Sequence, residues 1–197
     1  MGVSRFSTAV VETISTSPCI HDAVECGQII SHHAFNPMMS PEEAKANEYD
    51  PDTIAQIELD DEARKEAAQL ILQIEAAFAG IPRPAATLSV ARGYDDEWIL
   101  SEDRVLELNA QDPEMTWQEV TDASIQACQE YFFFSDAEGW RFYLPAYMCH
   151  YLRDFPDAGW DAVYWACVSL DHVDLLDEAQ LRCVDHFVQL CHKYEGL

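Results

Sequence analysis

The chain has 197 residues, 49% apolar and 24% charged, which is the composition of a folded protein and not of a disordered one. Its 36 acidic and 11 basic residues give a net charge of −25, which argues against binding to nucleic-acid phosphates or anionic membrane surfaces. No apolar run approaches the roughly 20 residues of a membrane span, and the length suits one domain with or without an extension.

The N-terminal part lacks a clean hydrophobic period. Residues 1–16 contain β-branched side chains in no regular pattern, so we expect an irregular segment or one short strand. Ser17 and Pro18 match an N-cap followed by proline at the first helical position, which predicts a helix over 18–33. The chain start has no sustained apolar core, so we expect no signal peptide and a cytoplasmic location.

The domain organisation follows from a change of pattern near residue 60. The stretch 35–60 is acidic and carries three prolines, which predicts a linker with one short helix at 41–48. From residue 61 the sequence is rich in strong helix formers. We therefore predict an N-terminal extension and acidic linker over 1–60 and a helical domain over 61–197.

The first helix of that domain has an apolar stripe at helical spacing and a stop signal. Gly80 suits the residue after a helix end, and prolines follow it. The stripe predicts one buried face. It consists of Ala67, Leu70, Ile71, Ile74, Ala77 and Phe78.

Two capping boxes punctuate the middle of the chain. Thr116 with Glu119 predicts a helix that runs to about Tyr131, and Ser135 with Glu138 predicts the start of another. Because a proline removes a backbone hydrogen bond, we expect a kink or a restart at Pro145.

The C-terminal part continues as helices. That second helix should run on to about Arg153, a short helix should cover 159–170, and a capping box from Asp177 to Gln180 should start the last helix. We predict a mainly α fold, a compact orthogonal helical domain with an irregular or partly helical N-terminal extension.

Sequence patterns for metal or catalytic chemistry are weak. Cys19, His21, Cys26, His32 and His33 lack the paired spacing of a zinc site, and core packing explains them better. No phosphate loop, dinucleotide fingerprint or nucleophile elbow occurs. We assign no catalytic residue, no metal and no cofactor.

The histidines near the C-terminus and the cysteines of the whole chain also give no convincing metal or catalytic site. His172 and Asp174, with His186 or His192, imitate an iron-binding triad, but a match of so few residues is common by chance. The seven cysteines are scattered and odd in number, which favours buried reduced thiols over disulfides.

The aromatic segment from Tyr131 to Leu152 has two interpretations. Aromatic side chains dominate cores, yet Trp140, Arg141 and Tyr143 also suit a partner-binding patch. Arg141 alternatively forms a structural clamp with a carboxylate. Its candidate partners are Asp95, Asp96 and Glu138.

A second candidate patch is acidic. Asp95, Asp96 and Glu97 form either a solvated acidic turn or part of a surface that binds a basic partner.

The string from Ser135 to Tyr147, SDAEGWRFYLPAY, resembles the "sPEGfRyYLPAyl" signature of a bacterial domain family of unknown function. The similarity covers about residues 66–192 and leaves 1–60 outside. Two departures are Trp140 in place of a smaller aromatic residue and the Cys149-His150 pair after the motif. The resemblance implies a helical cytoplasmic protein, in the company of toxin–immunity or other conflict genes, and implies no activity.

Three functions remain open. The leading hypothesis is a non-catalytic acidic protein that binds a basic protein partner, like an immunity protein or an inhibitor, without direct nucleic-acid or membrane binding. The second is an enzyme or metal-binding protein that uses the aromatic segment with Asp95, Asp96 or His150. The third is a DNA mimic, which needs carboxylates spaced like phosphates.

Overall fold

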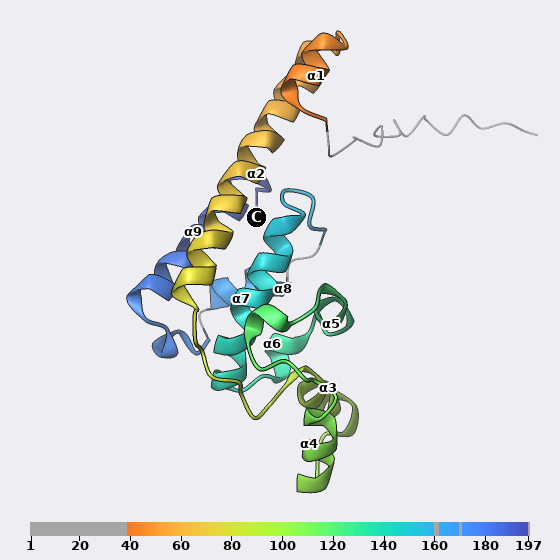
Figure 1. Cartoon of the computed structure of the whole chain (residues 1–197), viewed down its shortest axis with the longest axis vertical. Coiled ribbons are helices and arrows are strands. Elements are labelled where there is room, and N and C mark those ends of the chain that lie inside the picture. Colours follow the sequence, from red (N-terminus) through yellow and green to blue (C-terminus); the bar gives the residue numbers. More distant parts are fainter. Residues whose placement is uncertain (1–38, 160–161, 170, 197) are drawn as a thin grey trace, which may run out of the picture. The chain divides into compact units, whose positions relative to one another are not determined.

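The computed structural model describes residues 39–159, 162–169 and 171–196, and there the secondary structure is helical without a strand (Figure 1). This confirms the predicted mainly α fold, while the predictions for residues 1–38, the helix over 18–33 included, lie outside the described residues. The elements are α1 (Pro41–Ala46), α2 (Pro51–Ala77), α3 (Leu88–Glu97), α4 (Glu102–Asn109), η1 (Trp117–Glu119), α5 (Asp122–Ala127), α6 (Tyr131–Phe134), α7 (Ala137–Arg153), α8 (Ala162–Ser169), η2 (Val173–Leu175) and α9 (Glu178–Tyr194).

Helix α1 confirms the short helix predicted at 41–48. The Ser40 hydroxyl accepts the Glu43 N–H at 3.2 Å, and the Glu43 carboxylate accepts the Ser40 N–H at 2.9 Å. This reciprocal capping box satisfies two backbone donors at the helix start.

Helix α2 begins earlier than predicted. Asp50 accepts the Thr53 N–H at 3.0 Å and Pro51 occupies the first helical position, so residues 51–60 are helical and not linker. The boundary expected at residue 60 therefore falls inside a continuous helix. Although α2 has 27 residues, no helix in the described parts of the chain is both long and apolar enough to cross a bilayer.

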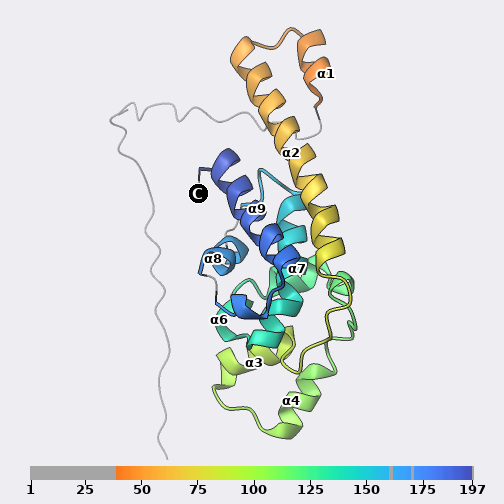
Figure 2. The ribbon, with the colours of Figure 1, turned by 90° about the vertical axis from the view of Figure 1, so that its left-hand side faces the viewer.

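Helix α7 is the centre of the core. Every residue from Phe142 to Leu152 is buried, which is the pattern of a helix covered on all sides. Helices α2 and α9 pack on each other, and α2 also packs on α7; both views show this (Figures 1 and 2). The aromatic segment is thus chiefly core, and Tyr131 meets Tyr143 edge to face at 4.7 Å between ring centroids.

The prediction of a single helix from Thr116 to about Tyr131 is wrong. The Thr116 capping box opens only the short turn η1, because Val120 then adopts extended backbone with ψ 122°. Thr121 caps the separate helix α5 by accepting the Ser124 N–H at 3.1 Å, and α6 follows as a third piece.

Helix α7 differs from the prediction in its cap, which is Asp136 and not Ser135; Asp136 accepts the Gly139 N–H at 2.7 Å. Of the kink or restart expected at Pro145, the restart does not occur, because the helix continues through Pro145 to Arg153. Proline removes one backbone hydrogen bond, but burial of the surrounding α7 side chains keeps the helix continuous.

The C-terminal helices follow the predicted pattern closely. Helix α8 lies within the predicted 159–170, and Asp177 with Gln180 forms the predicted capping box of α9. Gly80 has φ +74°, the left-handed conformation that favours glycine after a helix.

Candidate binding surface

Helices α3 and α4 form a hairpin whose base is held by polar side chains from the flanking loops. Asp112 accepts the Ser89 N–H and hydroxyl, each at 2.8 Å, and so caps the start of α3 from outside the helix. The Arg83 guanidinium donates to the carbonyls of Asn109, Asp112 and Glu114 at 3.1, 2.8 and 2.9 Å. These bonds satisfy backbone groups that the end of α4 leaves open.

Close packing brings the two helices together. A Cβ on Gly93 would lie 2.6 Å from Leu108 Cδ1 and 3.2 Å from Leu100 Cδ1, so a larger residue there would require these leucine side chains to move. Leu108 is buried between the helices.

The turn itself is strained. Trp98 has φ 60° and ψ −36°, and the Ile99 N–H donates to the Glu97 carbonyl at 2.7 Å, which closes a three-residue turn of the rarer, positive-φ kind. A bulky side chain in this region is a backbone outlier, and such outliers concentrate at functional surfaces.

The same turn exposes its apolar side chains. Trp98 and Ile99 are each 86% exposed. Residues 94–103, which we name the α3–α4 tip, therefore present an aromatic and an aliphatic side chain to solvent. Leu106 on α4 and Met115 beyond it are also largely exposed.

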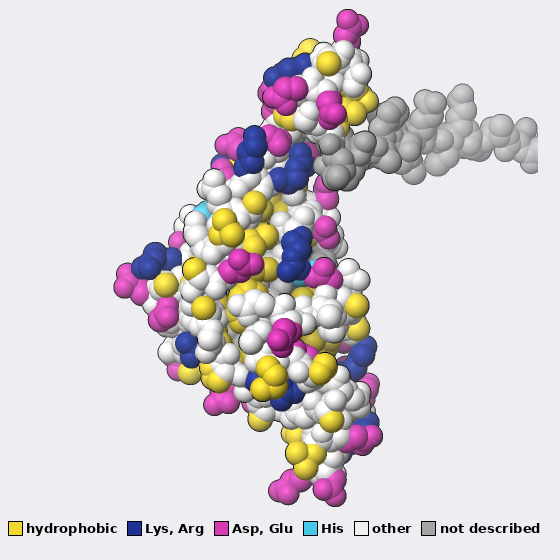
Figure 3. All heavy atoms as spheres, in the orientation of Figure 1, with side chains coloured by type: hydrophobic (Ala, Val, Ile, Leu, Met, Phe, Trp, Pro, Cys, Tyr) yellow, Lys and Arg dark blue, Asp and Glu magenta, His cyan; other side chains and the backbone are white. Residues whose placement is uncertain are grey.

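Acidic residues flank this apolar pair in the sequence. Figure 3 shows acidic and apolar side chains together at the end of the molecule where α3 and α4 lie. Arg104, the nearest base along the sequence after the tip, is held by Glu97 and Glu107 at 2.9 and 2.8 Å. The tip itself contains no Lys or Arg. Its acids are Asp95, Asp96, Glu97, Glu102 and Asp103.

The predicted site residues divide into two groups. Asp95, Asp96 and Glu97 lie exposed on the last turn of α3, beside Trp98. Trp140 and Tyr143 are 2% and 0% exposed, so the predicted patch on the aromatic segment has no surface to offer at these two residues. Their burial follows from the position of α7 in the core.

Tyr143 has a structural partner. Its hydroxyl donates to Glu114 Oε1 at 2.9 Å in the interior, and burial raises the pKa of Tyr143. A buried carboxylate with a hydroxyl donor of this kind fixes the loop after α4 on α7.

Arg141 does not form the predicted clamp with Asp95, Asp96 or Glu138. The side chain is half-buried, and its Nη2 donates to Gln180 Oε1 at 3.4 Å. Arg141 lies on the part of α7 that meets the start of α9, which explains the glutamine partner.

His150 is paired with a residue that the sequence did not indicate. Its Nδ1 lies 2.8 Å from Asp122 Oδ1, and Arg153 Nη1 lies 2.6 Å from the same oxygen. Asp95 and Asp96 belong to α3, whereas this carboxylate belongs to α5. Burial raises the pKa of the neighbouring Cys149 to about 12, so its thiol is not ionised at neutral pH.

The five cysteines in the described residues are buried. Burial also raises the pKa of Cys128 to about 11 and that of Cys191 to about 12, so these thiols pack as small hydrophobic groups. Among the described residues no three His, Cys, Asp or Glu side chains gather as metal ligands, His172 and Asp174 included.

The sequence reasoning missed Trp98 and Ile99. The available signal was an aromatic–aliphatic pair directly after three acids, in a stretch with no apolar stripe to bury it. Because no apolar helix face lies next to this pair in the sequence, its exposure could have been predicted.

Comparison with known proteins and with models of protein families gives a match to a family. No curated protein and no solved structure matches the chain. One family model matches residues 66–194, and its description is a family of unknown function, DUF6714. This range is close to residues 66–192, over which the sequence resembles a family of unknown function. The chain therefore belongs to the DUF6714 family.

Proposed function

We propose that this chain is a non-catalytic protein of the bacterial cytoplasm that binds a basic protein partner through the α3–α4 tip, in the manner of an immunity protein or an inhibitor. The observation that carries the proposal is the exposed Trp98-Ile99 pair in a strained turn that acidic residues flank on both sides in the sequence. Tryptophan is among the residues that most often dominate binding energy, and it does so when a partner excludes water around it.

The acidic residues of the tip determine which charge a partner should carry. Asp95 and Asp96 on the rim favour a basic surface, whereas Glu97 is already paired with Arg104. The net charge of −25 attracts a basic partner over a longer range. Rim charges of this kind act mainly on the association rate and its salt dependence. The apolar pair should then determine how slowly the complex dissociates.

The other two hypotheses have less support. Of the residues named for an enzyme or a metal site, His150 is buried and paired with Asp122, and Asp95 and Asp96 lie on α3 and not beside it. A DNA mimic would not place an exposed tryptophan and isoleucine at the centre of its acidic surface, because phosphates have no apolar counterpart.

A comparative pull-down tests the proposal. Tagged wild-type chain and Trp98→Ala are exposed to host lysate at low salt and eluted with a salt step. We expect one dominant basic protein that the wild type retains, that leaves below about 0.5 M salt, and that Trp98→Ala loses.

Matched variants make the result specific. Leu72→Ala removes a 66% exposed apolar side chain from α2 and should retain the partner. With the partner purified, Trp98→Ala should weaken binding by about 2 kcal/mol, and Asp95→Asn with Asp96→Asn should slow association. Equal retention by wild type and Trp98→Ala would refute the proposal, as would a complex indifferent to salt.

A further inference from the structure

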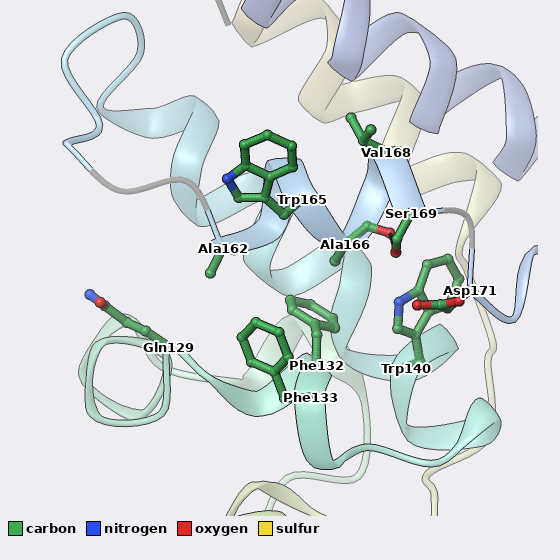
Figure 4. A pocket seen from close by; sticks show the side chains of 10 residues that line it. All are labelled: Gln129, Phe132, Phe133, Trp140, Ala162, Trp165, Ala166, Val168, Ser169 and Asp171. Atoms are coloured by element: carbon green, nitrogen blue, oxygen red, sulfur yellow. Dashed lines mark hydrogen bonds between the residues drawn. The ribbon is translucent and has the colours of Figure 1, made fainter.

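A separate cleft of about 240 Å³ lies where α6, the start of α7 and α8 meet (Figure 4). Phe132 and Phe133 lie side by side across from Trp165, and Trp140 and Asp171 also line the cleft. Phe133 is 82% exposed and Trp165 55% exposed, so aromatic rings reach the open mouth of the cleft. The cleft belongs to other elements than the α3–α4 tip and does not depend on the function proposed for the tip.

Two polar groups of the cleft have no partner among the described residues. The Trp140 side chain is 2% exposed, and its indole N–H, which faces the cleft in Figure 4, makes no hydrogen bond with a described residue. Its nitrogen is not among the fully buried atoms that lack a partner, so the N–H is accessible to a small acceptor in the cleft. The exposed Asp171 carboxylate likewise makes no hydrogen bond or ion pair with a described residue. The cleft thus presents one donor and one negative charge beside apolar walls.

The size and charge of the cleft restrict its ligand. Its volume lies below the roughly 300 Å³ at which ordinary ligand pockets begin, so it suits a group of few heavy atoms and not a nucleotide. Aromatic faces attract organic cations, and quaternary ammonium groups are the ligands that clusters of such rings typically hold. None of the residues that line the cleft is Lys or Arg, so no protein cation already neutralises Asp171 there.

We propose that this cleft binds a small alkylammonium cation that also carries a hydrogen-bond acceptor, as choline does. The ammonium group lies among Phe132, Phe133 and Trp165 with the Asp171 carboxylate near it. The acceptor oxygen takes the Trp140 N–H. This arrangement pairs the Trp140 donor and the Asp171 carboxylate, which is the one carboxylate among the described residues that line the cleft, with a single ligand.

A titration of the full chain tests the site with two probes of the same shape. Choline is compared with 3,3-dimethylbutan-1-ol, its neutral counterpart, and indole N–H resonances are followed by NMR. Trp165→Phe identifies the Trp165 resonance. We expect choline to shift tryptophan resonances saturably and to bind at least tenfold more tightly than the neutral alcohol.

Four exposed residues provide two test variants and two control variants that should not affect folding. Asp171→Asn should reduce choline binding about tenfold, to the level of the alcohol, while Asp174→Asn on η2 leaves it unchanged. Trp165→Ala should weaken binding at least tenfold, while Trp98→Ala at the tip leaves it unchanged. Loss of partner binding at the tip with intact choline binding would separate the two proposals.

The contrary outcomes are equally definite. Equal binding of choline and the alcohol would overturn the cation site, as would unaltered choline binding by Asp171→Asn or no saturable shift.

A peptide carrying trimethyllysine presents the same cation from a protein. Tighter binding of the peptide than of choline assigns the source to a protein side chain, and the reverse assigns it to a small molecule; both support the site.

Discussion

The helices α2, α7 and α9, which we name the body, and the α3–α4 tip treat aromatic side chains in opposite ways. In the body Phe142 and Phe187 are fully buried, whereas at the tip Trp98 is 86% exposed on a strained turn. Both regions have well-formed helices and polar side chains that hold them in place. The tip is therefore not a loosely packed end, because a hairpin held by specific contacts keeps its apolar residues exposed.

The largest expected contrast is between a core and a tip substitution. Phe142→Ala should lower the free energy of unfolding by about 3–5 kcal/mol, because it opens a cavity in a fully buried site. Trp98→Ala should change it by less than about 1 kcal/mol, since the side chain is solvated in the folded chain. Urea denaturation followed by circular dichroism measures both. Similar losses from the two variants would contradict the comparison.

A buried hydrogen bond gives the next effect. Tyr143→Phe removes the donor to Glu114 and leaves a buried acceptor without its partner, which should cost about 1–3 kcal/mol. The same denaturation experiment applies. Tyr94→Phe, on the exposed part of α3, is the matched control and should be close to neutral. A neutral Tyr143→Phe would mean that water replaces the hydroxyl.

The strain at the tip predicts a smaller effect of unusual sign. Glycine adopts positive φ without steric cost, so Trp98→Gly should be more stable than Trp98→Ala by roughly 1 kcal/mol. In most exposed positions glycine is the less stable of the two. A glycine variant less stable than the alanine variant would show that the turn does not hold its left-handed conformation in solution.

The smallest effect depends on pH. Burial raises the pKa of Glu195, so the folded chain keeps this proton to a higher pH than the unfolded chain. The unfolding free energy therefore falls as the pH rises from the ordinary glutamate pKa through the raised one. Glu195→Gln cannot ionise and still accepts the Tyr151 hydroxyl. It should gain stability over wild type across that interval.

Thermal melts at a series of pH values measure this gain. Glu75→Gln, which changes an exposed carboxylate on α2, should run parallel to the wild type over the same interval. A Glu195→Gln curve that also stays parallel would mean that the carboxyl is as well solvated in the folded chain as in the unfolded one.

Local sequence signals predicted most of the body. The capping box at Asp177 and the stripe that ends near Phe78 each act within one helix, so a single sequence displays them. Predictions failed where the deciding contact is distant or only one residue long. Val120 turns to extended backbone and divides the helix expected after Thr116.

The tip was harder to predict because distant residues build it. Its acids were identified as partner-binding candidates, but helices α3 and α4 have no long apolar stripe. Asp112 and Arg83, from outside both helices, hold their ends, and Gly93 permits their approach. The display of Trp98 depends on these contacts, so the sequence pattern alone could not place it.

Helix α2 also determines where a shorter recombinant fragment of the chain should begin. The family match begins at residue 66, in mid-helix, although Ile57 and Ala63 upstream are 1% and 0% exposed and α1 packs on α2. A recombinant fragment that starts at residue 66 would expose apolar surface along a truncated helix and invite aggregation. A fragment that starts at residue 39 keeps α1 and the whole of α2, and limited proteolysis should leave it intact where the shorter fragment is digested.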